Sequence, residues 1–424
     1  MLRITVTEAR VWGGADPGGS KSISNRILVL KALAGADMTV RHLSASNDTA
    51  VLDTLLRENP FEWNVQDAGT AARFSAAYLA TRAGEEHILT GTGRMPSRPM
   101  KPLLDALAYM GAGITYLGET GFLPVRIRGA KLTGGTFRLP HDVSSQFVSA
   151  LAMVAPLCER GLVLEFDAAP LSAPYIGMTL SMLSEMYIHC EGEHAPDGSE
   201  RIAVSRGTPS LPASYRVESD WSSASYWYAA TALAEEGEVH LHGYLEDSLQ
   251  GDSVTASLFD SLGVSTRFTE EGMVIKKTER PAMEDFDFDF SDHPDLAPTF
   301  AVVLPLLGIR ARLAGLQTLR HKESNRVEVL VENLAALGIR AVASPDYAEM
   351  EIFPAGGTPV PDALIRCHGD HRMAMAFAPA VLKTGALRLD HPEVVEKSYP
   401  DFWKQFGLIF KSSILNVDYL NDSQ

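Results

Sequence analysis

Residues 330–338 read Leu-Val-Glu-Asn-Leu-Ala-Ala-Leu-Gly, and this design of an apolar helix that ends at glycine recurs along the chain. The leucines are spaced three and four apart, which is typical of a helix with one buried face, and glycine is the usual residue just past a helix end. Similar stretches end at Gly111 and Gly263, and a weaker copy has Tyr187 in the glycine position. A strand-like segment follows each of them.

The spacing of these helix ends predicts a repeated unit. The positions 111, 187, 263 and 338 lie 76, 76 and 75 residues apart. One such ending can arise by chance, but equal spacing favours repetition. A period near 75 is too long for a solenoid and matches a compact α/β unit, of which 424 residues would hold about six. The length also predicts two domains.

Composition excludes several classes of partner. The chain has 37 Lys and Arg residues against 53 Asp and Glu residues, a formal net charge of −16. Such a charge repels nucleic acid and anionic membranes, so neither is expected as a partner. The 3 cysteines are far apart in the sequence, which excludes a disulfide scaffold and a cysteine-rich zinc module. With no predicted signal peptide or membrane span, a cytoplasmic location is expected.

Basic side chains cluster where helices are predicted to begin, although the helix dipole disfavours cations there. Lys322 and Arg326 are four apart, and on one helical face they would repel each other. A bound anion would relieve this cost. One such segment is typical of a solvated surface, but four in an acidic chain predict a shared site for several anions. The four segments contain Lys21 and Arg26, Arg94 and Arg98, Lys322 and Arg326, and Arg372.

Hydroxyl and carboxylate groups mark further candidate positions. Residues 143–146 and 220–225 open apolar helices with more polar side chains than one helix cap requires, which weakly predicts an oxygen-rich ligand. Acidic and aromatic residues alternate over 285–290, as in a strand with a solvated acidic face. Asp295 follows this strand and precedes a strongly apolar run, where it serves either as a helix cap or as a partly buried base.

Taken in order, these segments resemble the EPSP synthase family of 3-phosphoshikimate 1-carboxyvinyltransferases. The resemblance implies an α/β fold of the enolpyruvyl transferase type, with two domains around an interdomain cleft. Each domain would contain three small α/β repeats arranged as an inside-out α/β barrel. Residues 1–19 and 219–424 would form domain I, on the phosphoenolpyruvate and catalytic side, and residues 20–218 an inserted domain II, on the shikimate 3-phosphate side. The segments that carry the resemblance are 19–26, 68–71, 94–100, 144–147, 172–176, 220–225, Asp295, 322–326, 370–374 and 397–401.

The resemblance also implies a reaction. The enolpyruvyl group of phosphoenolpyruvate would pass to the 5-hydroxyl of shikimate 3-phosphate, with release of phosphate by addition and elimination. No metal and no organic cofactor is implied, and a monomer is expected. The two small substrates together bring four anionic groups, which would explain why an acidic chain gathers basic residues at helix starts.

The family's functional residues map onto positions of this chain. Asp295 would be the general base, Glu323 would lie near the methylene carbon, and Lys322 would lie beside the attacking oxygen, with Lys21 as a fourth catalytic residue. How the proton transfers divide among Glu323, Lys322 and Lys397 stays open. Residues matching the phosphoenolpyruvate site are Lys21, Gly69, Arg94, Gln146, Arg326, Arg372 and Lys397. Residues matching the shikimate 3-phosphate site are Lys21, Ser22, Arg26, Ser144, Ser145, Gln146, Ser172, Tyr175, Asp295 and Lys322.

Two alternatives have to be weighed against this assignment. The sister enzyme that acts on UDP-N-acetylglucosamine shares the architecture, but its mobile loop usually carries a reactive cysteine that residues 94–100 lack. A non-catalytic or RNA-end-processing protein on a related fold is disfavoured by net acidity and by the retained Asp295, Glu323 and Lys322. The chain departs from the usual family pattern at Asp67, Phe74, Trp221, Thr318 and Asn325.

Overall fold

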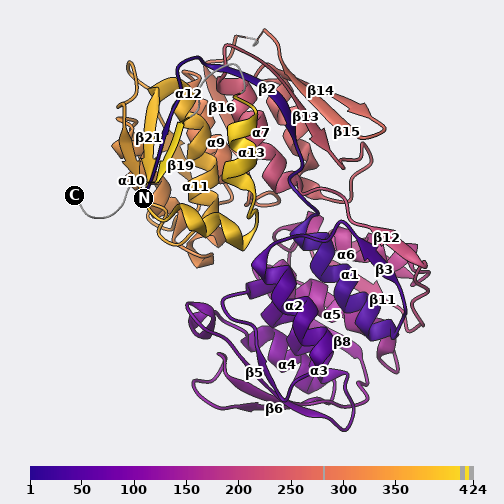
Figure 1. The fold of residues 1–424 in the computed structure, drawn as a ribbon. Coiled ribbons are helices and arrows are strands. Elements are labelled where there is room, and N and C mark those ends of the chain that lie inside the picture. The colour runs from indigo at the N-terminus through magenta and orange to yellow at the C-terminus, as the bar shows by residue number, and fades with distance from the viewer. Residues whose placement is uncertain (280–281, 411–415, 420–424) are drawn as a thin grey trace. The chain divides into compact units, whose positions relative to one another are not determined.

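The computed structural model describes residues 1–279, 282–410 and 416–419, and the chain divides into two compact units. Unit 1 comprises Met1–Gly18 with Glu218–Gln424, and unit 2 comprises Gly19–Val217. The indigo N-terminal segment lies among the orange and yellow elements of unit 1 (Figure 1), where strand β1 (Leu2–Thr5) pairs with β21 (Ala386–Leu389). The chain therefore begins in unit 1, builds all of unit 2, and returns to complete unit 1.

The described residues form six sheets, and five of them share one strand order. In each of the five, two parallel strands are followed by two antiparallel ones. The sheets of unit 2 are β4 (Glu62–Asn64), β5 (Glu86–Thr90), β7 (Val125–Arg128) and β6 (Gly113–Tyr116); β8 (Gly135–Leu139), β9 (Leu162–Phe166), β11 (Glu200–Val204) and β10 (Cys190–His194); and the parallel pair β3 (Thr39–Arg41) and β12 (Ser214–Arg216). Those of unit 1 are β2 (Arg10–Ala15), β13 (Glu236–His242), β15 (Gly272–Lys277) and β14 (Val264–Thr269); β16 (Asp285–Asp289), β17 (Arg310–Ala314), β19 (Met350–Ile352) and β18 (Ala341–Ala343); and β20 (Ala363–Ile365), β21, β1 and β22 (Asn416–Tyr419).

Buried helices form the core of each unit, and most of them directly follow the first strand of a sheet. Every residue of α3 (Gly69–Ala80), α7 (Trp221–Leu233), α9 (Ala297–Leu306) and α11 (His371–Phe377) is buried. In unit 1, α7, α9 and α11 pack against one another, and in unit 2 α3 packs against α5 (Ser145–Val154). Apolar side chains all round a helix indicate burial on every side. The predicted α/β fold class is confirmed: helices lie inside each unit and small sheets lie outside.

The helix ends that revealed the repeat adopt the conformation that the glycines predict. Gly111, Gly263 and Gly338 have φ values of 111°, 81° and 78°, just past α4 (Lys101–Tyr109), α8 (Thr255–Asp260) and α10 (Arg326–Ala336). Tyr187 has φ 63° just past α6 (Ala173–Glu185), so a tyrosine occupies the left-handed position in the fourth copy. These helix-end signals are local, which is why the sequence alone reveals them.

Candidate active site

Arg326, the first residue of α10, lies among three carboxylates of unit 1. Its side chain is 2% exposed, and it donates from Nε to Asp370 over 2.8 Å, from Nη2 to Glu323 over 2.7 Å, and from Nη1 to Asp295 over 2.9 Å. Burial opposes the charge of Arg326, but these three carboxylates outweigh it and raise the pKa of Arg326 above its usual value. The guanidinium therefore stays charged and fixes the positions of its partners.

Asp295 also binds Arg372, the second residue of α11. Nη2 of Arg372 donates to Asp295 over 2.6 Å, and Nη1 donates to the hydroxyl of Tyr226, in α7, over 3.1 Å. Burial raises the pKa of Tyr226 to about 12, so the phenol is neutral. Asp370 accepts from the backbone N–H of Arg372 over 3.0 Å and caps α11. Both arginines thus lie in the first turn of a helix, and both bind the carboxylate of Asp295.

Two lysines complete this cluster. Nζ of Lys322 lies 3.7 Å from Oδ1 of Asp295, and Nζ of Lys397 lies 4.0 Å from Oε1 of Glu323. Partial burial lowers the pKa of Lys322, an effect that Asp295 offsets in part and that the nearby arginines reinforce. The cluster therefore combines a lysine that deprotonates more readily than usual with two carboxylates in ion pairs, which is a suitable set of groups for proton transfer.

The prediction that Lys322 and Arg326 share one helical face is wrong. Lys322 has extended backbone angles at the end of a short 3₁₀ turn, η4 (Gln317–His321), and α10 begins only at Arg326. In the segment between η4 and α10, the hydroxyl of Ser324 donates to Asp370 over 3.1 Å. The two cations meet through their common partner Asp295 and not through helical spacing.

In unit 2, Lys21 is the first residue of α1 (Lys21–Ala34). The hydroxyl of Ser20 caps this helix by accepting from the N–H of Ile23. Nζ of Lys21 lies 3.7 Å from Asp48, which is 3% exposed in the first turn of α2 (Asn47–Glu58). An ammonium group at a helix start is unfavourable alone, and the carboxylate of Asp48 offsets that cost.

Arg26 is the third buried arginine of the predicted set, after Arg326 and Arg372, and it contacts other predicted residues. It is 2% exposed and donates to the backbone carbonyls of Ser22 and Tyr175, each over 2.9 Å. It also donates to the hydroxyl of Thr179, and its guanidinium lies 5.5 Å from the ring centroid of Phe74. Burial lowers the pKa of Arg26 to about 10. Arg26 therefore braces α1 against α6, and Phe74, one of the departures, supplies a cation–π contact.

Gln146 and Gly69 lie in the first turns of neighbouring helices. Nε2 of Gln146 in α5 donates to the hydroxyl of Thr70 in α3 over 3.1 Å. Gly69 is packed against Arg98, since a Cβ added at Gly69 would come within 2.3 Å of Nη1 of Arg98. Arg94, which is exposed, precedes the short 3₁₀ turn η1 (Met95–Ser97). The missing side chain at Gly69 therefore leaves room for the guanidinium of Arg98.

The predicted serines also lie at helix starts of unit 2. Ser144 caps α5 by accepting from the N–H of Gln146, and Ser145 is the first residue of that helix. Ser172, with φ 58°, precedes α6, and Tyr175 lies in the first turn of the same helix. The predicted residues thus fall into two sets. Asp295, Lys322, Glu323, Arg326, Arg372 and Lys397 belong to unit 1, and the remaining ten belong to unit 2.

Three partners carry no assigned role in the sequence-based prediction: Asp370, Asp48 and Tyr226. Asp370 precedes the His-Arg pair at a helix start, which is a signal for a cap but not for a salt bridge to Arg326. Asp48 and Tyr226 become partners of Lys21 and Arg372 only through tertiary contact. The spacing of residues in the sequence therefore does not predict these two pairs.

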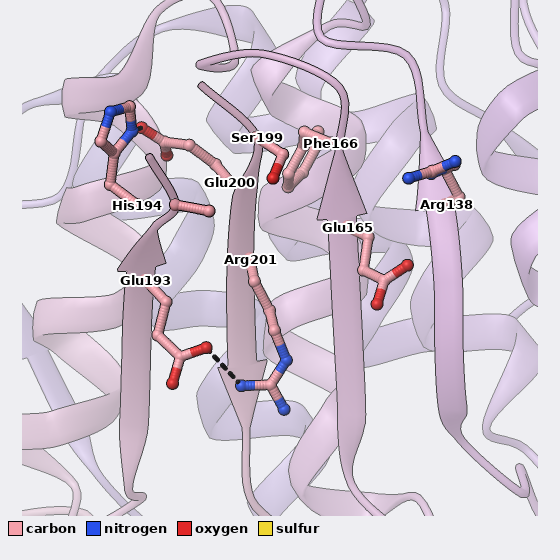
Figure 2. A pocket seen from close by; sticks show the side chains of 9 residues that line it. Arg138, Glu165, Phe166, Glu193, His194, Ser199, Glu200 and Arg201 are labelled. Atoms are coloured by element: carbon pink, nitrogen blue, oxygen red, sulfur yellow. Dashed lines mark hydrogen bonds and ion pairs between the residues drawn. The ribbon is translucent and has the colours of Figure 1, made fainter. Parts of the chain in front are cut away.

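A hollow of about 470 Å³ on unit 2 is lined by none of these residues. Figure 2 shows it over β8 to β11, where Glu193 and Arg201 form an ion pair of 3.0 Å and Arg138 and Glu165 lie on neighbouring strands. Among the described residues, no helix is long and apolar enough to cross a membrane. Nor do these residues include a group of three His, Cys, Asp or Glu side chains that could hold a metal ion.

Known proteins share this architecture. A solved structure of EPSP synthase from Acinetobacter baumannii superposes with a TM-score of 0.74 at 20% identity, covering 99% of this chain and 100% of that chain. Small sheets around buried helices, in that arrangement, define an enolpyruvyl transferase fold.

Sequence relatives narrow the class. A family model described as EPSP synthase (3-phosphoshikimate 1-carboxyvinyltransferase) matches residues 56–406. A 3-phosphoshikimate 1-carboxyvinyltransferase of Bacteroides fragilis (strain YCH46) is 41% identical over 390 residues, which cover 91% of this chain and 92% of that protein. One from Syntrophobacter fumaroxidans is 32% identical over 411 residues, with coverages of 92% and 95%. The chain belongs to the EPSP synthase family.

Proposed function

We propose that both units supply residues to one reaction, unit 1 the catalytic groups and unit 2 the groups that hold shikimate 3-phosphate. As a member of its family, the chain is a transferase of the shikimate pathway, which leads to chorismate and the aromatic amino acids. It transfers the enolpyruvyl group of phosphoenolpyruvate to the 5-hydroxyl of shikimate 3-phosphate and releases phosphate. The observation that carries the residue assignment is the cluster in which Arg326, Arg372 and Lys322 surround Asp295.

The chemistry needs a base for the hydroxyl and an acid for carbon. Deprotonation of the 5-hydroxyl and protonation of the methylene carbon give a tetrahedral intermediate with a methyl group, and loss of phosphate with removal of one proton from that methyl group gives the product. We assign the first task to Asp295 and the second to Glu323, with Lys322 beside the attacking oxygen. The side chains of Asp295 and Glu323 are 18% and 14% exposed, so neither carboxylate is closed off from a substrate.

The anionic groups of the substrates fit the cations. Arg326 and Arg372 suit the planar carboxylate of phosphoenolpyruvate, because guanidinium groups bind carboxylates through paired N–H donors. We assign the phosphate of phosphoenolpyruvate to Lys21, Gly69, Arg94, Gln146 and Lys397, and shikimate 3-phosphate to Lys21, Ser22, Arg26, Ser144, Ser145, Gln146, Ser172, Tyr175, Asp295 and Lys322. Backbone N–H groups at the starts of α1 and α5 favour such anions. We also propose that the protein is a monomer located in the cytoplasm.

Phosphate release tests the choice of acceptor. Purified protein is incubated with phosphoenolpyruvate and either shikimate 3-phosphate or UDP-N-acetylglucosamine, and released phosphate is measured against a sample without acceptor. The proposal predicts continuous release with shikimate 3-phosphate alone. Release with UDP-N-acetylglucosamine and none with shikimate 3-phosphate would contradict it and favour the sister activity.

A further inference from the structure

Both oxygens of the Asp295 carboxylate are held by arginines. Oδ1 accepts from Nη1 of Arg326 over 2.9 Å, and Oδ2 accepts from Nη2 of Arg372 over 2.6 Å. Lys322 adds a third cation at 3.7 Å from Oδ1. Charge-assisted hydrogen bonds of this length are strong, and here they engage both oxygens of the carboxylate. In this arrangement Asp295 is poorly placed to accept a proton from a hydroxyl group.

Other N–H donors of the two arginines are already engaged by neighbouring side chains. Arg326 is almost fully buried, and its Nε and Nη2 are held by Asp370 and Glu323. Nη1 of Arg372 is held by the hydroxyl of Tyr226. Nη1 of Arg326 and Nη2 of Arg372 both point at one planar carboxylate, that of Asp295, which therefore occupies the place where these two donors could bind another planar anion together.

We propose that Asp295 is an internal competitor for the carboxylate of phosphoenolpyruvate. This proposal rests on the function proposed above. When phosphoenolpyruvate binds, its carboxylate takes the place of Asp295 between Nη1 of Arg326 and Nη2 of Arg372. The displaced Asp295 keeps Lys322 as its cationic neighbour and becomes free to take the proton of the acceptor hydroxyl. Binding of one substrate thereby switches on the base that activates the other, and the acceptor is not deprotonated while phosphoenolpyruvate is absent.

Binding, measured without turnover, tests this exchange. Asp295→Asn removes the competing charge, whereas Glu323→Gln removes an equal charge from the same cluster but from Nη2 of Arg326. Titration calorimetry with phosphoenolpyruvate should show about tenfold tighter binding for Asp295→Asn, because the charge-assisted bonds of Asp295 to the arginines no longer have to be broken. Glu323→Gln should tighten binding less than about twofold.

Equal tightening in both variants, or unchanged or weaker phosphoenolpyruvate binding in Asp295→Asn, overturns the proposal. Should Asp295→Asn not fold, Asp295→Ser replaces it and the same ratio is measured. Turnover of the wild type with shikimate 3-phosphate tests the proposed function separately from the exchange at Asp295. Tighter binding without wild-type turnover would contradict the proposed function and leave the exchange supported, whereas turnover without tighter binding would do the reverse.

Discussion

The carboxylate of Asp370 accepts a hydrogen bond from Nε of Arg326 over 2.8 Å, and the two side chains are 0% and 2% exposed. The same carboxylate accepts from the backbone N–H of Arg372 and from the hydroxyl of Ser324. One side chain therefore caps α11 and fixes both arginines of the cluster. It touches no proposed reacting atom, so its role is to position Arg326 and Arg372.

Removing this carboxylate should destabilise the protein strongly. Asp370→Ala leaves a buried guanidinium short of a partner, and breaking a buried pair in this way costs about 3–5 kcal/mol. Urea denaturation followed by tryptophan fluorescence measures the loss. Glu349→Gln, which removes the carboxylate from an exposed pair with Arg312, is the control and should change stability little. Equal effects of the two variants would show that Asp370 does not anchor the cluster.

A methyl group at Gly69 should disturb substrate binding through Arg98. The added Cβ would come within 2.3 Å of Nη1 of Arg98, so the guanidinium must move. We expect Gly69→Ala to raise the KM for phosphoenolpyruvate with the fold intact. Gly177→Ala is the matched control, because Gly177 is exposed within α6 with no atom within 4 Å of an added Cβ. It should leave KM unchanged and add roughly 0.5–1 kcal/mol of stability. An unchanged KM in Gly69→Ala would count against the assignment.

The buried carboxyl group of Glu218 should make the free energy of unfolding depend on pH. Its buried carboxylate accepts from Trp221, Ser248 and Gln250, but burial outweighs these bonds and raises the pKa of Glu218 above its usual 4.5. The folded state then binds a proton more tightly than the unfolded state, and that contribution to stability is lost as pH rises through the raised pKa. Wild type should therefore lose stability relative to Glu218→Gln from pH 4.5 upward.

Denaturation midpoints at several pH values measure this difference. Glu246→Gln, at an exposed position of the same unit, is the control and should show no such trend. A wild type that instead gains stability over Glu218→Gln with rising pH would reverse the sign and refute the explanation.

The tyrosine at the fourth repeat end should be a site of strain. Tyr187 is 86% exposed with φ 63°, a conformation that costs a non-glycine residue about 1 kcal/mol. Tyr187→Gly should therefore raise the free energy of unfolding by about that amount. Gly338→Ala is the mirror experiment and should lower it, since the new Cβ would also lie 3.3 Å from Val360. A loss of stability in Tyr187→Gly would mean that its ring makes contacts that outweigh the backbone strain.

Local signals made the fold predictable from the sequence. Helix ends such as Gly338 and the alternation over 285–289 are set by neighbouring residues, and their regular spacing indicated the repeated α/β unit. The partners within unit 1 could not be predicted in this way. The hydrogen bonds from Arg326 and Ser324 to Asp370 join residues that are 44 and 46 positions apart. The prediction that Lys322 shares a helical face with Arg326 is wrong because Lys322 ends the η4 turn, before α10 begins.

Deuterium from solvent tests the proposed addition–elimination reaction most directly. If the methylene carbon is protonated and then deprotonated, the reaction of phosphoenolpyruvate with shikimate 3-phosphate in D₂O must place deuterium at that carbon of the enolpyruvyl product, as read by proton NMR or mass spectrometry. We predict deuterium in the product and in recovered phosphoenolpyruvate only when both substrates are present, with strong suppression in Glu323→Gln. Product that forms without deuterium would contradict the mechanism.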